Sequence, residues 1–231
     1  YADDFVVTGE SKEILEEKVM PVIHTFLKER GLELSGEKTS ITRIEDGFDF
    51  LGQRVRKHRE KFITIPSKSA VKSLLAKIKR IVNAHLGQPT STMIEELNSA
   101  MRGWANYHRH VCSKQTFSYI DTCIYTILWN WAQRRHSNKG KRWMKKHYFR
   151  TIGRRNWGFF GTQKLENGTT RVVDLLYMNT VKIVRHVKIQ GEANPYAREW
   201  QEYFSKRLNR KRSKVTEQPG LLNAEAGFSR A

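Results

Sequence analysis

The sequence contains few cysteines and no long apolar run. Only Cys112 and Cys123 occur among 231 residues, far fewer than a disulfide-stabilised secreted domain needs. No stretch approaches the roughly 20 apolar residues that a transmembrane helix requires. These two absences exclude a disulfide scaffold and a membrane-spanning protein, and they predict a chain without a membrane partner in a reducing, cytoplasmic compartment.

Acidic residues are almost absent from the middle of the chain. Residues 97–165 contain 14 Lys and Arg side chains but a single acid, Asp121, whereas residues 1–96 contain 16 basic and 15 acidic side chains. So strong a field of one sign implies a polyanionic partner. A membrane surface would need one amphipathic face, which the scattered Trp and Tyr residues do not form. Nucleic acid is therefore the predicted partner.

Apolar spacing predicts β structure and one helix in the first 65 residues. Apolar side chains recur at helical intervals between residues 11 and 30, where Ser11 can cap the helix and Pro21 is expected to bend it. An acidic turn at the start of the chain separates two short strands, the second at Phe5–Val7. Further strands are expected over residues 32–35, 40–44, 48–56 and 61–65.

From Ser67 onward apolar residues recur at the spacing of an α-helix. The sequence predicts a helix that Ser67 caps and Gly87 closes, and then helices over about 91–111, 114–135 and 141–148. A turn at 166–168 predicts a hairpin of residues 159–165 with 171–176. A strand over 181–189 and a helix over 199–208 are expected next, and a disordered tail from Asn209.

The first seven residues, Tyr-Ala-Asp-Asp-Phe-Val-Val, place two adjacent carboxylates between apolar segments. Asp3 and Asp4 in such a turn are suited to hold a divalent metal, because Mg²⁺ prefers hard oxygen ligands. Two such ions could activate a primer hydroxyl and stabilise a leaving pyrophosphate. A solvated turn is the alternative interpretation of an isolated Asp-Asp pair.

This heptapeptide resembles the catalytic hairpin of reverse transcriptases, and later segments resemble further blocks of group II intron enzymes in the expected order. Residues 34–42 (Leu-Ser-Gly-Glu-Lys-Thr-Ser-Ile-Thr) and 47–52 (Gly-Phe-Asp-Phe-Leu-Gly) are similar to the next two palm blocks. Residues 102–109 (Arg-Gly-Trp-Ala-Asn-Tyr-His-Arg) resemble the maturase-specific region. The resemblance extends to about Arg207 and implies a group II intron reverse transcriptase/maturase.

The resemblance also implies roles for individual residues. Asp3 and Asp4 correspond to two of the catalytic, metal-binding carboxylates, with Mg²⁺ as the expected cofactor, and Lys38 corresponds to the loop lysine near the incoming triphosphate. The element that steadies the primer end corresponds to Phe50, Leu51 and Gly52. The alternative for Lys38 is a solvated loop lysine. The alternative for Phe50 and Leu51 is that they are ordinary core residues of a strand.

Cations and aromatic residues interleave most densely between residues 134 and 155. Cations bind phosphates and release counterions, and aromatic rings stack on unpaired bases. A solvated basic surface over buried aromatic residues is the alternative, and Trp104, Trp129 and Trp131 are expected in the core. The predicted RNA-binding residues are Arg134, Arg135, Lys139, Lys141, Arg142, Lys145, Lys146, Arg150, Arg154 and Arg155.

These observations predict an α+β fold. Residues 1–65 are expected to form the C-terminal part of a reverse-transcriptase palm, 66–150 a helical thumb/maturase domain, 151–208 a mixed α/β basic extension and 209–231 a disordered tail. Because the sequence starts at Tyr1 rather than Met, we expect a fragment that lacks the upstream fingers and a further metal-binding Asp. Such a fragment is expected to be inactive as a polymerase on its own.

The predicted function is RNA-directed DNA polymerisation together with a maturase role in the splicing and mobility of a group II intron. The expected partners are the intron RNA and a DNA target or primer, in a bacterial cytoplasm or nucleoid or in an organelle. A homodimer through the palm or the region before it is left open. Two alternatives remain: a non-catalytic RNA-binding splicing factor that keeps the palm as a scaffold, and an inactive gene remnant.

Overall fold

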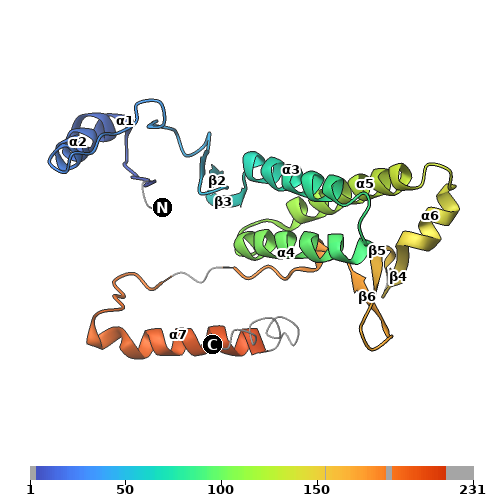
Figure 1. Ribbon diagram of the computed structural model, residues 1–231. Helices are drawn as coiled ribbons and strands as arrows, with labels where there is room; N and C mark the ends of the chain where they lie inside the picture. The colour runs from blue at the N-terminus through green and yellow to red at the C-terminus, as the bar shows by residue number, and fades with distance from the viewer. Residues whose placement is uncertain (1–3, 154, 186–188, 217–231) are drawn as a thin grey trace. The chain divides into compact units, whose positions relative to one another are not determined.

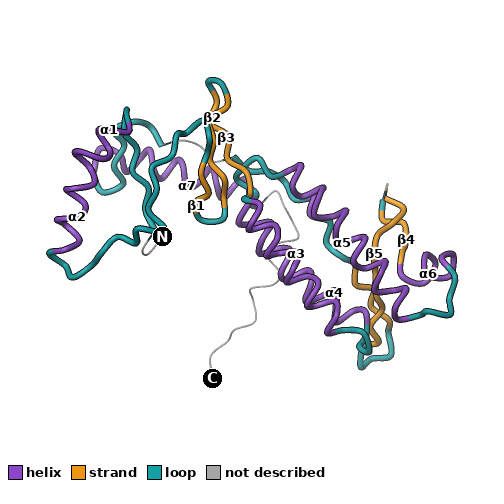
Figure 2. The backbone as a smooth tube through the Cα atoms, turned by 90° about the horizontal axis from the view of Figure 1, so that it is seen from above, coloured by secondary structure: helices purple, strands orange, loops and turns teal. Residues whose placement is uncertain are grey.

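The computed structural model describes residues 4–153, 155–185 and 189–216. The chain is a mixed α/β protein with two small antiparallel sheets (Figures 1 and 2), which confirms the predicted combination of helices and strands. It divides into two compact units, residues 1–186 and residues 187–231. None of the helices in the described ranges is long and apolar enough to cross a membrane.

Three helical segments follow one another near the N-terminus: α1 (Lys12–Ile14), η1 (Leu15–Val19) and α2 (Met20–Lys28). Ser11 caps them, because its hydroxyl oxygen accepts a hydrogen bond from a backbone N–H of the first turn. The helix predicted over residues 11–30 is therefore confirmed. A π-helical stretch, η1, comes directly before Pro21, and its wider turn accommodates a proline ring with no N–H to donate.

Three short strands predicted near the N-terminus do not form. Residues 5–7, 32–35 and 40–44 have no strand conformation. A strand is stable only when its backbone groups pair with a neighbour, and no described segment pairs with any of the three. Apolar composition therefore mispredicted these elements.

The first sheet has the strand order β1-β2-β3, with bounds Phe48–Phe50, Gln53–His58 and Lys61–Pro66. Phe50 pairs with Gln53, so the single strand predicted over residues 48–56 is instead a tight hairpin. Both loop residues have positive φ, 48° for Leu51 and 72° for Gly52, as a two-residue hairpin loop requires. The positive φ, and not a lack of space, accounts for the glycine at position 52. A Cβ on Gly52 would meet only the Cβ of Ala70, at an ordinary contact distance of 3.6 Å.

Three long helices, α3 (Lys68–Ala84), α4 (Thr90–His108) and α5 (Lys114–Arg135), confirm the helices predicted in this region. They run side by side (Figures 1 and 2). Ser67 caps α3 as predicted, its Oγ accepting from the Ala70 N–H at 3.1 Å. The fully buried side chains that hold the helices together follow the helical period: Ile78, Val82, Met93, Ile94, Leu97, Met101, Phe117, Ile120 and Trp131.

A second sheet packs on these helices. The predicted helix α6 (Lys141–Tyr148) leads into strands β4 (Phe149–Ile152), β5 (Arg155–Lys164) and β6 (Thr170–Asp174), in the order β4-β5-β6. The predicted β5–β6 hairpin is confirmed, whereas β4 was not predicted. Phe159 and Val173 bring the sheet into the helical core. Gly161 permits close approach, since a Cβ there would lie 2.7 Å from the backbone nitrogen of Ser91.

Asp121, the one acid of the most basic segment, has a structural position. It is buried on α5, and its carboxylate accepts hydrogen bonds from the backbone N–H groups of Met178 (2.9 Å) and Asn179 (2.8 Å) in the short helix η2 (Met178–Thr180). Burial raises the Asp121 pKa to about 6, although these hydrogen bonds and the charges of Arg155 and Lys114 act in the opposite direction. The acid therefore fixes η2 to α5.

The second unit contains η3 (Arg198–Trp200) and α7 (Gln201–Thr216). The helix predicted over residues 199–208 is confirmed, and it continues beyond Asn209, where the tail was expected to begin. Residues 217–231 lie outside the described ranges. The strand predicted over 181–189 is wrong for residues 181–185 and for residue 189; the Val184 N–H donates to the Arg109 carbonyl at 2.8 Å instead of to a neighbouring strand. Residues 186–188 are not described.

Candidate nucleic-acid interface

The end of α5, the loop after it and α6 present a group of exposed cations. No acidic residue occurs between Asp121 and Glu166 in the sequence, so this surface combines many positive charges with no acid from its own segment. We call the group the α6 cation cluster; it comprises Arg134, Lys139, Lys141, Arg142, Lys145 and Lys146. Of the other predicted RNA-binding residues, Arg154 lies outside the described residues.

The remaining three predicted cations make contacts within the protein, as Arg134 of the cluster also does through a 3.0 Å hydrogen bond that it donates to the side-chain oxygen of Asn83. Arg135 donates a hydrogen bond to the carbonyl oxygen of Gln88 at 2.6 Å. Arg150 donates through two nitrogens to both carboxylate oxygens of Asp174, and this ion pair raises the Arg150 pKa. The Arg155 guanidinium lies 3.2 Å from the centre of an aromatic ring. These three side chains therefore connect different segments of the fold to one another. The composition of the sequence could not reveal these contacts.

Aromatic side chains lie on both flanks of α6. On one flank Trp143 and His147 are stacked, with ring centroids 4.4 Å apart and planes 13° from parallel. On the other, the Lys145 Nζ sits 4.5 Å over the ring of Trp157. The core interpretation of the other tryptophans is confirmed: Trp131 is fully buried, and Trp104 and Trp129 pack half-buried against the core.

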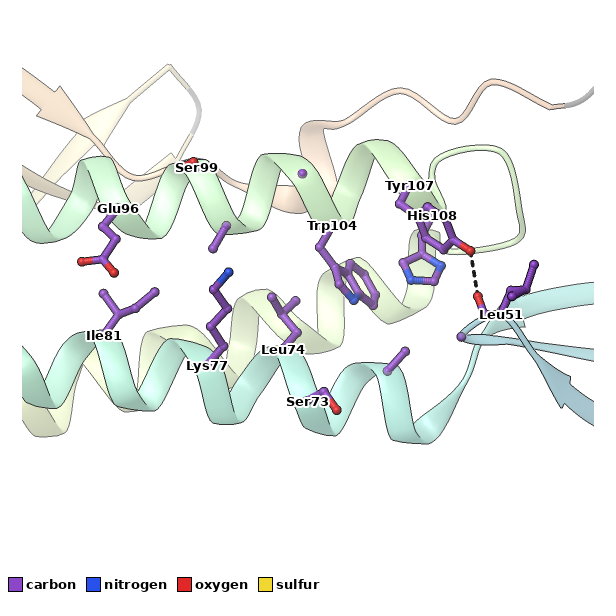
Figure 3. A pocket seen from close by; sticks show the side chains of 14 residues that line it. Leu51, Ser73, Leu74, Lys77, Ile81, Glu96, Ser99, Trp104, Tyr107 and His108 are labelled. Carbon is purple, nitrogen blue, oxygen red and sulfur yellow. Dashed lines mark hydrogen bonds between the residues drawn. The ribbon is translucent and has the colours of Figure 1, made fainter. Parts of the chain in front are cut away.

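A groove of about 990 Å³ lies along the junction of α3 and α4. Its walls carry small side chains at helical spacing, and Lys77 and Glu96 extend into it from opposite helices (Figure 3). Sequence reasoning missed this groove. The available signal was the run of small residues on facing sides of the helices: Ala70 and Ser73 on α3, and Ser99, Ala100 and Gly103 on α4.

Two of the three predicted primer-contact residues lie at one end of this groove. Leu51 and Gly52 line it, and the Leu51 carbonyl accepts a hydrogen bond from the hydroxyl of Tyr107 at 2.8 Å (Figure 3). The Gly52 carbonyl accepts from the Ser67 N–H at 2.9 Å. Phe50 ends β1 and is half-buried. The hairpin loop is thus tied to the first turn of α3 and to the end of α4.

The predicted catalytic residues are not gathered into a site by the part of the chain that the structure describes. Asp3 lies outside the described residues, Asp4 is exposed, and Lys38 is exposed in the turn at residues 36–38. Within the described ranges no three His, Cys, Asp or Glu side chains lie close enough to hold a metal ion. Asp4 alone does not make a Mg²⁺ site, because Mg²⁺ needs further carboxylate or phosphate ligands.

His108 is the one strongly perturbed histidine of α4. Its ring packs against Trp104 (centroids 4.1 Å apart) and Tyr107 (4.8 Å). The side chain is buried, and its Nδ1 has no hydrogen-bond partner among the described residues. Burial lowers the His108 pKa to about 4, and the neighbouring His110 contributes in the same direction. The imidazole is therefore neutral at physiological pH and serves as a core residue.

Two family models match the sequence. The model for the reverse transcriptase (RNA-dependent DNA polymerase) matches residues 1–55, and the model for the group II intron maturase-specific domain matches residues 71–149. No curated protein matches the chain. The first match contains the Tyr-Ala-Asp-Asp motif, Lys38 and the β1–β2 hairpin loop, and the second contains most of α3 and all of α4 to α6, with the whole α6 cation cluster.

Proposed function

Because the chain belongs to the group II intron reverse transcriptase/maturase family, we propose that it binds the RNA of a group II intron and acts in that intron's splicing and its copying into DNA. The observation that carries the proposal is the α6 cation cluster inside the match to the maturase-specific domain. Six exposed cations without an acid in the same segment suit an RNA backbone.

The maturase role requires binding to a folded RNA. The α6 cation cluster would neutralise phosphates and release counterions, which supplies affinity without sequence selection. A protein that binds the splicing-competent conformation of the intron more tightly than other conformations shifts the RNA toward it. This mechanism needs the binding surface alone, and no covalent chemistry.

We further propose that the domain boundaries follow the two matches. Residues 1–65 would form the end of a palm, supported by the match to residues 1–55 and by a sheet that ends at Pro66. Residues 66–150 would form the thumb/maturase domain, supported by the match to residues 71–149. Residues 151–208 would form a mixed α/β basic extension, of which Phe159 and Val173 belong to the same core as the helices.

The enzymatic part of the proposal is RNA-directed DNA polymerisation. Asp3 and Asp4 would hold Mg²⁺, which when bound would assist attack by the primer hydroxyl, and Lys38 would approach the triphosphate. Phe50, Leu51 and Gly52 would support the primer, and the position of the last two at the end of the α3–α4 groove favours this role. A DNA primer or target is the second proposed partner.

The binding surface is tested with a pair of charge-matched double variants. Arg142→Ala/Lys146→Ala removes two cations of the α6 cluster, and Lys18→Ala/Lys28→Ala removes two exposed cations from the N-terminal helix. We expect the first variant to raise the Kd for a transcribed group II intron RNA about tenfold, through two lost phosphate contacts. The second variant should stay within about twofold of the unaltered chain. Both are measured by filter binding at one salt concentration.

Equal weakening by the two variants would show that RNA responds only to total charge, and the proposed surface would be wrong. Asp3→Ala separates the catalytic part from the binding part. It should leave the Kd for RNA unchanged, and it should abolish primer extension on an RNA template in any form of the protein that extends a primer. A non-catalytic splicing factor, the second candidate, would show the same RNA binding and no dependence of its function on Asp3.

A further inference from the structure

The surface of α6 is divided into four sectors, of which Lys141 and Lys145 form one and the other three follow. Successive residues of a helix are rotated by about 100°, so residues four apart share a sector. Met144 and Tyr148 form the buried sector that packs on the core. Arg142 and Lys146 form an exposed cationic sector, and Trp143 and His147 form an aromatic sector between the other two.

The aromatic sector is a preformed stack. The Trp143 and His147 rings lie 4.4 Å apart and within 13° of parallel, and the His147 side chain is exposed. His136 meets the tryptophan edge-on at 4.8 Å, and a 2.6 Å hydrogen bond joins its Nε2 to the hydroxyl of buried Tyr148. The half-buried end of the stack is thus fixed to the core, while the other end faces solvent.

Packing alone does not account for this arrangement. The inward side of α6 is already filled by Met144 and Tyr148, so an exposed imidazole stacked on Trp143 adds little to the core. Trp157 on the opposite flank is exposed as well, but its ring meets Tyr125, Trp129 and Phe149 edge-on and has Lys145 over it at 4.5 Å. His147 is exposed and lies nearly parallel to Trp143, so the Trp143–His147 flank is the one that offers a stacked pair of rings to a ligand.

The neighbouring sector supplies phosphate contacts at the right spacing. Lys146 follows Trp143 by three residues, and such pairs lie about 5–6 Å apart on a helix surface. Lys139 also lies beside the stack, its Nζ 5.8 Å from the centre of the Trp143 ring. A nucleotide could thus place its base on the rings and its phosphate beside a cation, which is how single-stranded nucleic acids are bound.

We propose that Trp143 and His147 form a stacking platform for an unpaired base of the bound RNA, with Arg142 and Lys146 holding the adjacent phosphates. This inference rests on the proposed RNA binding and adds its ligand class: an unpaired nucleotide at a loop, bulge or single-stranded end. Bases inside an RNA duplex are stacked on one another, so a duplex would use the cations but not the rings.

The test compares a labelled 12-nucleotide oligo(A) with a blunt 12-base-pair RNA duplex by fluorescence anisotropy. His147→Leu removes the exposed ring, and Trp143→Leu removes the ring beneath it while keeping an apolar contact. We expect each to weaken oligo(A) binding by about five- to fiftyfold and to leave duplex binding within about twofold. His147→Tyr keeps an aromatic ring and should retain most of the affinity. Tyr196→Ala, at an exposed aromatic residue of the second unit, is the matched control.

The outcomes separate this inference from the proposed function. Arg142→Ala/Lys146→Ala should weaken both RNAs; if it weakens neither, the RNA surface itself is misplaced. If that variant weakens both RNAs while His147→Leu and Trp143→Leu weaken neither, RNA binding stands and the stacking platform is wrong. Equal loss for oligo(A) and duplex in the His147→Leu variant would also overturn the platform. Because His147 is exposed, the urea unfolding midpoint of the His147→Leu variant should match that of the unaltered chain.

Discussion

His108 lies at the end of α4 with its ring against Trp104 and Tyr107. Its folded-state pKa of about 4 is below the ordinary value of 6.5, so between these pH values the unfolded chain binds a proton that the folded chain does not. The stabilisation is therefore complete above pH 6.5 and is lost as the pH falls through 4. Between pH 7 and pH 5 we expect His108 to reduce the free energy of unfolding by about 2 kcal/mol.

A His108→Gln variant isolates this contribution, because glutamine does not titrate. Asp121 acts in the opposite direction: its folded pKa of about 6 is raised, so its contribution is present at low pH and is lost as the pH rises. Both chains contain Asp121, so the difference between their urea unfolding curves at pH 7 and pH 5 reports His108 alone. Parallel pH dependence in the two chains would show that His108 is not the responsible group.

Composition predicted where exposed cations cluster, but not which of them have partners inside the fold. Arg135 and Arg150 stand in the same basic run as Arg142 and Lys146, yet their partners, Gln88 and Asp174, are distant in sequence. Only the folded chain brings those partners close. The α3–α4 groove was missed for the same reason, since it depends on two helix faces meeting.

At the scale of elements, Asp121 links α5 to η2 through hydrogen bonds to two backbone N–H groups. In an Asp121→Asn variant one oxygen remains as an acceptor, while the amide nitrogen faces an N–H donor and leaves it unpaired. A buried donor without a partner costs about 2 kcal/mol. We therefore expect this substitution to lower the free energy of unfolding by about that amount at pH 7.5, measured by urea denaturation.

Glu166→Gln is the matched control, because it removes the same charge from an exposed turn between β5 and β6. We expect it to change the stability by less than about 0.5 kcal/mol. If both substitutions lowered the stability equally, the loss of a negative charge from a basic protein would explain the result, and the hydrogen bonds to η2 would not.

Helices were predicted more successfully than strands because their hydrogen bonds are local. The 3.6-residue period of Leu74, Ile78 and Ile81 reports the buried face of α3 directly. A strand depends on a partner elsewhere in the chain, so the apolar segment at residues 5–7 gave a false strand. The hairpin at residues 48–56 gave a false continuous strand, because positive φ at Leu51 is not expected from its sequence.

At the scale of the whole molecule, the net charge of +19 is distributed unevenly. Residues 1–96 are nearly neutral, with 16 basic and 15 acidic side chains, whereas residues 97–165 contain 14 basic side chains and one acid. Arg135, Arg150 and Arg155 use part of this excess inside the fold. The exposed remainder is concentrated in the α6 cation cluster, and in the proposed RNA complex its size would set the number of phosphates that the protein neutralises.

This count sets the salt dependence of RNA binding. Six phosphate contacts predict a slope of about −4 to −5 for log K against log salt, a loss of roughly 250- to 1,000-fold in affinity between 50 and 200 mM salt. Arg142→Ala/Lys146→Ala should make the slope shallower by about two, whereas Lys18→Ala/Lys28→Ala should leave it unchanged. The measurement is a series of RNA titrations at four salt concentrations. A flat dependence for the unaltered chain would mean that phosphate contacts do not drive binding, and equal slopes in both variants would place the contacts outside α6.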